Sequence, residues 1–249
     1  MMRDKMRPPT SPLIALKDLS YLPDGKPVLS GVTLETDAKR IGIVGRNGSG
    51  KTTLARIIAG LLAPDAGTVR IGGVDVARDR KAALGAVGIL FQNPDHQIIF
   101  PTVEEELAFG LAQLGQNKPE IETAVAAMLH RFGKAHWAGA AIHQLSQGQR
   151  QLVCLMSVLA MAPRVIVLDE PFAGLDIPTT RQLARVLDGL DVCLVLITHD
   201  PAMLEVYDRV LWIDEGRILQ DGDAKPVLHA FEQQMLRLGG GDDLSDLAG

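Results

Sequence analysis

The stretch that decides the fold is Gly45-Arg46-Asn47-Gly48-Ser49-Gly50-Lys51-Thr52-Thr53. It fits the pattern G-x-x-x-x-G-K-[ST] at every fixed position, which is the pattern of a phosphate-binding loop. Its glycines let the backbone curl so that successive N–H groups point at phosphate oxygens. Residues 40–44 before it are predicted to form a short buried strand, and residues 52–61 after it a helix. The positive end of that helix would face the same anion, so we predict a nucleotide-phosphate site here.

Two residues of this loop have distinct predicted roles. Lys51 is expected to reach the β- and γ-phosphates of a nucleotide, while the hydroxyl of Thr52 binds Mg²⁺. The alternative is a glycine-rich turn without a ligand, which the strand before the motif and the helix after it disfavour. The predicted nucleotide contacts in the loop are Gly45, Asn47, Gly48, Ser49, Gly50, Lys51, Thr52 and Thr53.

A second motif consists of four apolar residues, Val165 to Leu168, that end in Asp169 and Glu170. The unbroken apolar run indicates a strand buried on both faces, as in a parallel sheet. The tip of such a strand lies beside the phosphate loop, where Asp169 is predicted to bind Mg²⁺ directly or through water. Glu170 is predicted to polarise the water that attacks the γ-phosphate. Considered alone, the two acids could equally be a solvated strand end.

The third motif is Leu145-Ser146-Gln147-Gly148-Gln149, in which Ser146 is a candidate helix N-cap. Together, in this order, the three motifs resemble the ATP-binding-cassette (ABC) ATPase family. The resemblance covers nearly the whole chain, residues 13–219. The third motif matches the family signature L-S-G-G-Q except at Gln147, where glycine is commonest.

The predicted strands flank a helix-rich middle, in which residues 102–114, 119–132 and 146–161 are expected to be helical. The resemblance implies an α/β fold with a P-loop (RecA-like) core, an antiparallel β subdomain and an inserted α-helical subdomain. We expect a single ABC ATPase domain over residues 13–240. Its parts are a core with β subdomain (about 13–98 and 160–240), a helical subdomain (about 99–159), and flexible tails at 1–12 and 240–249.

The resemblance also implies a dimer of ATPase subunits packed head to tail. In the family, the signature of one subunit closes over the ATP held by the phosphate loop of the other. Carried over to this chain, Ser146 and Gly148 would touch the γ-phosphate of the partner's nucleotide, with Gln149 belonging to the same contact. Neither half-site is complete alone, so MgATP would hold the two surfaces together.

Four further family positions are filled. Tyr21 stands where an aromatic side chain stacks on adenine, with a core or surface aromatic as the alternative. Gln92 matches the Q-loop glutamine, which touches Mg²⁺ or water and senses the membrane partner. Asp176, in Ala173-Gly174-Leu175-Asp176, matches the D-loop, and His199 matches the switch histidine that contacts the γ-phosphate. Glu170, His199 and Gln92 are therefore the predicted catalytic residues, and Thr52, Gln92 and Asp169 the predicted metal ligands.

The stretch from Phe91 to Gly110, which begins Phe-Gln-Asn-Pro-Asp-His-Gln, indicates which type of ABC ATPase the chain resembles. It resembles the ATPases of energy-coupling factor (ECF) transporters, which import vitamins and transition-metal ions. The resemblance implies a groove that grips helices of a transmembrane coupling protein. The residues expected to line it are Ile98, Ile99, Phe100, Leu107 and Phe109, with ordinary core as the alternative for each.

About thirty residues follow the hairpin that is predicted to end at Leu219. This short remainder favours one ATPase type used twice, as a homodimer, and resembles the dedicated micronutrient uptake systems. Biotin is the favoured solute, and cobalt or nickel is the alternative. The expected partners are a second copy of the chain, a transmembrane coupling protein and a substrate-binding membrane protein.

Composition sets the remaining expectations. The net charge of −5 argues against nucleic-acid binding, and no apolar run approaches the length of a membrane span. We therefore expect a peripheral protein at the cytoplasmic face of the plasma membrane, with Cys154 and Cys193 as buried free thiols. The composition disfavours two other functions. A soluble ABC ATPase of DNA repair or translation usually adds coiled coils or zinc modules, and a non-catalytic regulator would not need Glu170 and His199.

Overall fold

A six-stranded sheet forms the centre of the computed structural model, which describes residues 12–239. Five of its strands run parallel, and the sixth, at one edge, is antiparallel to its neighbour. In spatial order the strands are β10 (Arg217–Gly222), β9 (Arg209–Asp214), β3 (Arg40–Val44), β8 (Cys193–Ile197), β7 (Val165–Asp169) and β6 (Val87–Leu90). Every residue of β7 and β8 is buried, as their unbroken apolar sequences predict.

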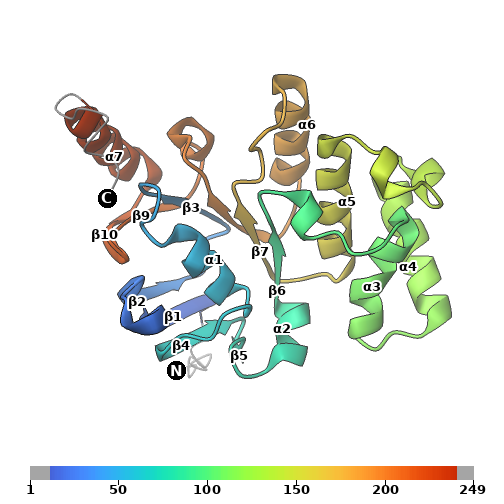
Figure 1. The fold of residues 1–249 in the computed structure, drawn as a ribbon, viewed down its shortest axis with the longest axis horizontal. Helices are drawn as coiled ribbons and strands as arrows, with labels where there is room; N and C mark the ends of the chain where they lie inside the picture. Colours follow the sequence, from blue (N-terminus) through green and yellow to red (C-terminus); the bar gives the residue numbers. More distant parts are fainter. Residues whose placement is uncertain (1–11, 240–249) are drawn as a thin grey trace, which may run out of the picture.

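A second, antiparallel sheet covers one face of this core. It contains β2 (Leu29–Thr36), β1 (Ile14–Tyr21), β4 (Ala66–Ile71) and β5 (Val74–Asp75), in that order. Helix α1 (Lys51–Ile58) lies between the two sheets, and its apolar residues share one hydrophobic cluster with strands of both (Figure 1). The phosphate loop is therefore anchored at both ends, by the buried strand β3 and by this buried helix.

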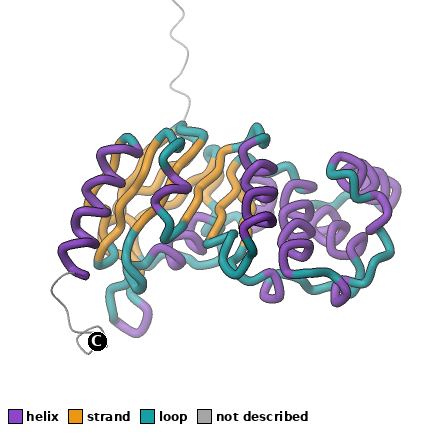
Figure 2. The backbone as a smooth tube through the Cα atoms, turned by 90° about the horizontal axis from the view of Figure 1, so that it is seen from above, coloured by secondary structure: helices purple, strands orange, loops and turns teal. Residues whose placement is uncertain are grey.

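The helical part of the chain extends to one side of the sheets and has a hydrophobic cluster of its own (Figure 2). It contains α3 (Val103–Gln113), α4 (Lys118–Arg131) and α5 (Gln147–Ala160). Helix α5 belongs to both parts, because Val153 and Met156 pack into the helical cluster while Cys154 and Leu155 pack against the central sheet. The helices confirm the predicted subdomain, and its exact boundaries stay a prediction.

Several sequence expectations need correction. Helix α1 ends at Ile58 rather than near residue 61, because Gly60 takes a left-handed conformation with φ 72°. Helix α2 (Arg80–Ala86) was not predicted, although Asp79 caps it by accepting a hydrogen bond from the Ala82 N–H at 2.9 Å. Leu107 is fully buried in the helical cluster, so its predicted place in a surface groove is wrong.

Helix α7 (Ala224–Gly239), which follows β10, is a further element that was not predicted. It packs on the edge of the central sheet, where the rings of Phe231 and Trp212 meet edge to face with centroids 5.6 Å apart. Helix α6 (Ile177–Asp188) leads from β7 back to β8. The predicted tails lie outside the described residues, apart from residue 12.

Both cysteines are buried and unpaired, as predicted. Among residues 12–239, no helix combines the length and the apolar character that crossing a membrane requires.

Candidate nucleotide site

A cavity of about 640 Å³ opens where the parallel strands β7 and β8 end and α1 begins. The structure gathers there most of the residues that the motifs single out. Its lining includes Asn47, Gly48, Gly50, Lys51, Thr52, Thr53, Gln92, Asp169, Glu170 and His199. Two residues that sequence reasoning missed, Val28 and Ile197, complete it. Ile197 could have been found, since it ends a parallel strand beside the strand that carries Asp169.

The phosphate loop is tightly held against its neighbours. At Gly45, a Cβ atom would lie 2.2 Å from the carbonyl oxygen of Ile213, so any side chain would push the loop off β9. Gly48 and Gly50 have φ values of 80° and 99°, which glycine adopts without strain. The loop backbone therefore has the glycine-dependent curvature that a phosphate cradle requires.

Two donors in this loop fit a phosphate group. The hydroxyl of Ser49 is buried and has no hydrogen-bond partner among the described residues. The ammonium of Lys51 donates to the carbonyl oxygens of Gly45 and Arg46 at 2.8 and 2.7 Å, and has a third proton to offer. Burial lowers the pKa of Lys51, although the nearby carboxylates of Glu170 and Asp169 act against this shift. An incoming phosphate would satisfy both side chains.

The predicted magnesium ligands also lie together. The hydroxyl of Thr52 donates to Asp169 Oδ1 at 3.3 Å, and Gln92 lines the same cavity. Mg²⁺ in nucleotide sites needs only one or two protein oxygens, since water and phosphates supply the others. The donor set of Thr52 and Asp169 therefore fits Mg²⁺. Burial raises the pKa of the Asp169 carboxyl, and the hydrogen bond from Thr52 partly offsets this rise.

Asp169→Asn is expected to stabilise the nucleotide-free chain. Because the folded-state pKa of Asp169 is raised, its ionised form weakens the fold at neutral pH, and this penalty vanishes as the pH falls through that pKa. Asparagine can still accept the bond from Thr52 without a charge, so we expect a Tm higher by about 2–4 °C. The same variant should gain less Tm from MgATP than the wild type does. Differential scanning fluorimetry with and without MgATP measures both, and a lower Tm without nucleotide would contradict the prediction.

Glu170 is placed by an unusual backbone conformation. Its φ is 50°, a left-handed value that costs energy for a residue other than glycine, and its N–H donates to the Ile197 carbonyl at 3.0 Å. The turn directs its carboxylate to His199, whose Nδ1 lies 2.8 Å from Glu170 Oε2. Glu170 and His199 therefore form a direct pair in the lining of the cavity, and both lie where a nucleotide phosphate would enter.

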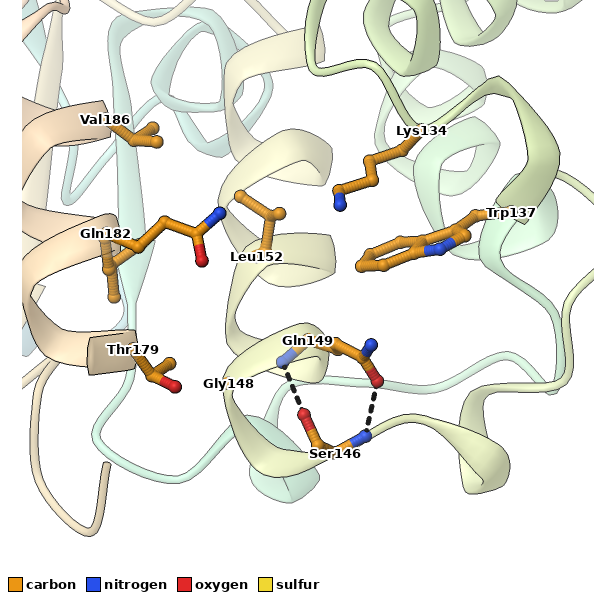
Figure 3. A pocket seen from close by; sticks show the side chains of 10 residues that line it. Lys134, Trp137, Ser146, Gly148, Gln149, Leu152, Thr179, Gln182 and Val186 are labelled. Atoms are coloured by element: carbon orange, nitrogen blue, oxygen red, sulfur yellow. Dashed lines mark hydrogen bonds between the residues drawn. The ribbon is translucent and has the colours of Figure 1, made fainter. Parts of the chain in front are cut away.

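The signature residues lie elsewhere, in a smaller cavity of about 250 Å³ between α5 and α6 (Figure 3). Ser146 caps α5 reciprocally with Gln149: Ser146 Oγ accepts from the Gln149 N–H at 3.3 Å, and Gln149 Oε1 accepts from the Ser146 N–H at 2.8 Å. Gly148 lies on the same turn. Beside them, the Lys134 ammonium lies 4.6 Å from the centre of the Trp137 ring. Because its Oε1 accepts the Ser146 N–H, the side chain of Gln149 is already engaged in the cap of α5.

Two further residues predicted to contact ATP, Tyr21 and Asp176, line neither of these two cavities. Tyr21 is half-buried and packs against the hydrophobic cluster between the sheets, outside the lining of the nucleotide cavity. Asp176 caps α6 by accepting from the Thr179 N–H at 2.9 Å, and hydrogen bonding by Thr179 lowers its pKa. Their roles toward ATP stay predictions.

The chain belongs to the ABC transporter family, whose sequence model matches residues 29–173, more than half of the chain. It is thus an ATP-binding protein of the class that hydrolyses ATP with Mg²⁺. One relative is the Biotin transport ATP-binding protein BioM of Rhodobacter capsulatus, 51% identical over 86% of this chain and 92% of its own length. Another is the Energy-coupling factor transporter ATP-binding protein EcfA of Methanothermobacter thermautotrophicus, 38% identical over 88% of this chain and 74% of its own length.

Among solved structures, a dimeric ATP-binding cassette in a post-hydrolysis state, bound to ADP and Pi, superposes with a TM-score of 0.74. It is 25% identical, and the match covers 85% of this chain and 99% of that one. The predicted fold class is confirmed.

Proposed function

We propose that the chain is the ATP-hydrolysing subunit of an ECF-type importer and that the imported solute is biotin. The observation that carries this is the 51% identity with a biotin transport ATP-binding protein, which extends over 86% of the chain. The sequence around Gln92 and Gln97 adds the resemblance to ECF ATPases, which the similarity to EcfA supports. No observation on the chain favours cobalt or nickel over biotin.

The active unit is a dimer of two copies. In one chain, the phosphate loop and the signature residue Ser146 line different cavities, so a single copy offers each ATP only half of its contacts. A second copy, turned head to tail, would bring its Ser146 to the nucleotide held by Lys51. The solved structure of a dimeric ATP-binding cassette bound to ADP and Pi supports the pairing of two copies.

The residues of the cavity divide the work of hydrolysis. Lys51, which bonds the carbonyls of Gly45 and Arg46, donates its third proton to a phosphate oxygen. Thr52 and Asp169 would hold Mg²⁺, and the ion would supply positive charge beside the phosphates. Glu170 accepts a hydrogen bond from the attacking water, while His199, its present partner, turns to the γ-phosphate. Glu170 must therefore part from His199 before each turnover.

The surface beside Gln92 is suited to a membrane partner. Ile99 is 67% exposed, and the ring of Phe100 lies 5.2 Å from that of the partly exposed Phe109. A shallow cavity runs from Ile99 past Pro101 and Ile142. The carboxylate of the buried Glu106 fixes this segment by accepting from the N–H groups of Ile99 and Phe100, at 2.9 and 3.0 Å.

This docking surface is also joined to the nucleotide cavity. Gln97 Oε1 accepts from the Phe91 N–H at 3.2 Å, and Gln151 Nε2 donates to the Phe91 carbonyl at 3.1 Å. Displacement of the surface would thus pull on the residue next to Gln92. A transmembrane coupling protein, together with a substrate-binding membrane protein, is the proposed partner, and it would hold the chain at the cytoplasmic face of the membrane. Nucleic acid is not a proposed partner.

The paired variants Ile99→Ser and Leu107→Ala test the docking surface within biotin uptake. Ile99→Ser should preserve the Tm, yet reduce co-purification with the membrane partners and uptake of labelled biotin by about tenfold, since a hot-spot side chain often contributes that much to binding. Leu107→Ala should instead destabilise the free chain by about 2–5 kcal/mol, because it opens a cavity in the core.

Vesicles that contain the whole complex supply the assay, with labelled cobalt and nickel as competing cargo. Uptake of a metal ion without uptake of biotin would contradict the assignment of biotin as the imported solute. ATP hydrolysis that never responds to any membrane partner would overturn the transport function itself.

A further inference from the structure

We propose that Gln147 is a positioning residue that ties the signature turn to the turn carrying Glu170, so that the two ATP sites of a dimer are coupled through each chain. The inference rests on the proposed head-to-tail dimer. Gln147 is the first residue of α5 and is exposed. Its side-chain amide Nε2 donates to the carbonyl oxygen of Ala173 at 3.2 Å. Ala173 lies in the turn between β7 and α6, far from Gln147 in sequence but beside it in the fold.

Ala173 is bonded on its other side to the catalytic turn. Its N–H donates to the carbonyl oxygen of Glu170 at 3.2 Å. One residue therefore connects Glu170, which would act on the chain's own ATP, with Gln147, which adjoins the Ser146 that would contact the partner's ATP. Gly174 follows with φ 74°, and a Cβ atom there would lie 2.9 Å from Gln147 Nε2. The amide thus fills the space beside this turn.

A close contact between the Gly148 backbone and the Thr179 side chain joins the first turns of α5 and α6. A Cβ atom on Gly148 would lie 2.3 Å from Thr179 Cγ2, so the first turns of α5 and α6 touch (Figure 3). The N–H of Thr179 is in turn capped by Asp176. The contact between Gly148 and Thr179 fixes the spacing of the helices. The hydrogen bond from Gln147 to Ala173 links α5 specifically to the turn that carries Glu170, because the Ala173 N–H donates to the Glu170 carbonyl.

Gln147 is the position at which this chain departs from the usual signature, and glycine there has no side chain to make the bond. When Glu170 and its turn rearrange around the chain's own ATP, Gln147 would carry the shift to Ser146. Each chain then favours closure at the second site once the first is closed. Such a link is a coupling free energy between sites and is read as cooperativity.

Gln147→Ala and Gln147→Met test the coupling, since methionine keeps length and helix propensity but has no donor. Both variants should bring the Hill coefficient of ATP hydrolysis down to about 1 and raise the ATP concentration for half-maximal rate severalfold. Nucleotide affinity of the separate chain, measured with a non-hydrolysable ATP analogue, should stay within about twofold, because the phosphate loop is untouched. Gln113→Ala, an exposed glutamine on α3, is the matched control and should change neither quantity.

A Hill coefficient equal to the wild-type value in both variants would overturn the coupling, as would a wild-type coefficient of about 1 in dimers that do close on ATP. A wild-type chain that binds ATP and never pairs would instead contradict the proposed function, so the two failures are distinguishable.

Discussion

Glu170→Gln is expected to leave MgATP binding intact and to slow hydrolysis by about 100-fold, the usual contribution of a positioned acid or base. The amide keeps the size of the carboxylate and can stay near His199, 2.8 Å away in the wild type. It cannot take up the proton of the attacking water. ATP would therefore stay uncleaved between two chains, and the variant should accumulate as a closed dimer in MgATP.

The measurements are steady-state ATPase rate, nucleotide affinity, and mass by light scattering with and without MgATP. Glu215→Gln is the matched control, since Glu215 also has a positive φ, 45°, but lies in the exposed turn between β9 and β10. It should hydrolyse ATP at the wild-type rate. If Glu170→Gln did so too, the assignment of Glu170 would be wrong.

Lys51→Ala and Ser146→Asp should each abolish ATP hydrolysis, yet recover measurable activity, up to about a quarter of the wild-type rate, when the two chains are co-expressed in equal amounts. In a head-to-tail dimer, both changes fall on one site of a mixed pair and leave the other site intact. Half of the dimers are mixed if pairing is random. Aspartate is as good an N-cap as serine, so α5 should keep its start while the new charge repels the partner's phosphate.

The control mixture is Lys51→Ala with Glu170→Gln. Lys51 and Glu170 line one cavity of the same chain, so a mixed pair carries one defect in each of its sites. This mixture should stay inactive. Recovery of activity in the control, or none in the first mixture, would refute the shared site, and chromatography of differently tagged chains would verify that mixed dimers form.

The sequence predicted most of the nucleotide cavity because the motifs sit at strand ends. Residues that follow neighbouring parallel strands meet at one edge of the sheet, which is why Lys51, Asp169 and His199 could be placed together beforehand. The sequence pattern did not predict which apolar residues of the helical part lie at the surface. Leu107 and Ile99 are both apolar and near each other in sequence, but only three-dimensional packing decides that one is buried and the other exposed.

The sequence pattern also did not predict the short helix α2 or the C-terminal helix α7. Helix α2 is only seven residues long, too short for a helical period to stand out, and α7 packs on the sheet edge, where Phe231 meets Trp212. Hydrogen bonds between distant segments, such as that from Gln147 to Ala173, leave no periodic trace in a sequence. Such features follow from how elements pack, which a single chain's pattern does not encode.

Helix α5 has a consequence for dissecting the molecule. It contributes Val153 and Met156 to one hydrophobic cluster and Leu155 and Val158 to another. A fragment made of residues 99–159 alone would expose to water the apolar face of this helix that packs against the central sheet. The excised helices would thus aggregate sooner than fold, and neither half of the protein is autonomous.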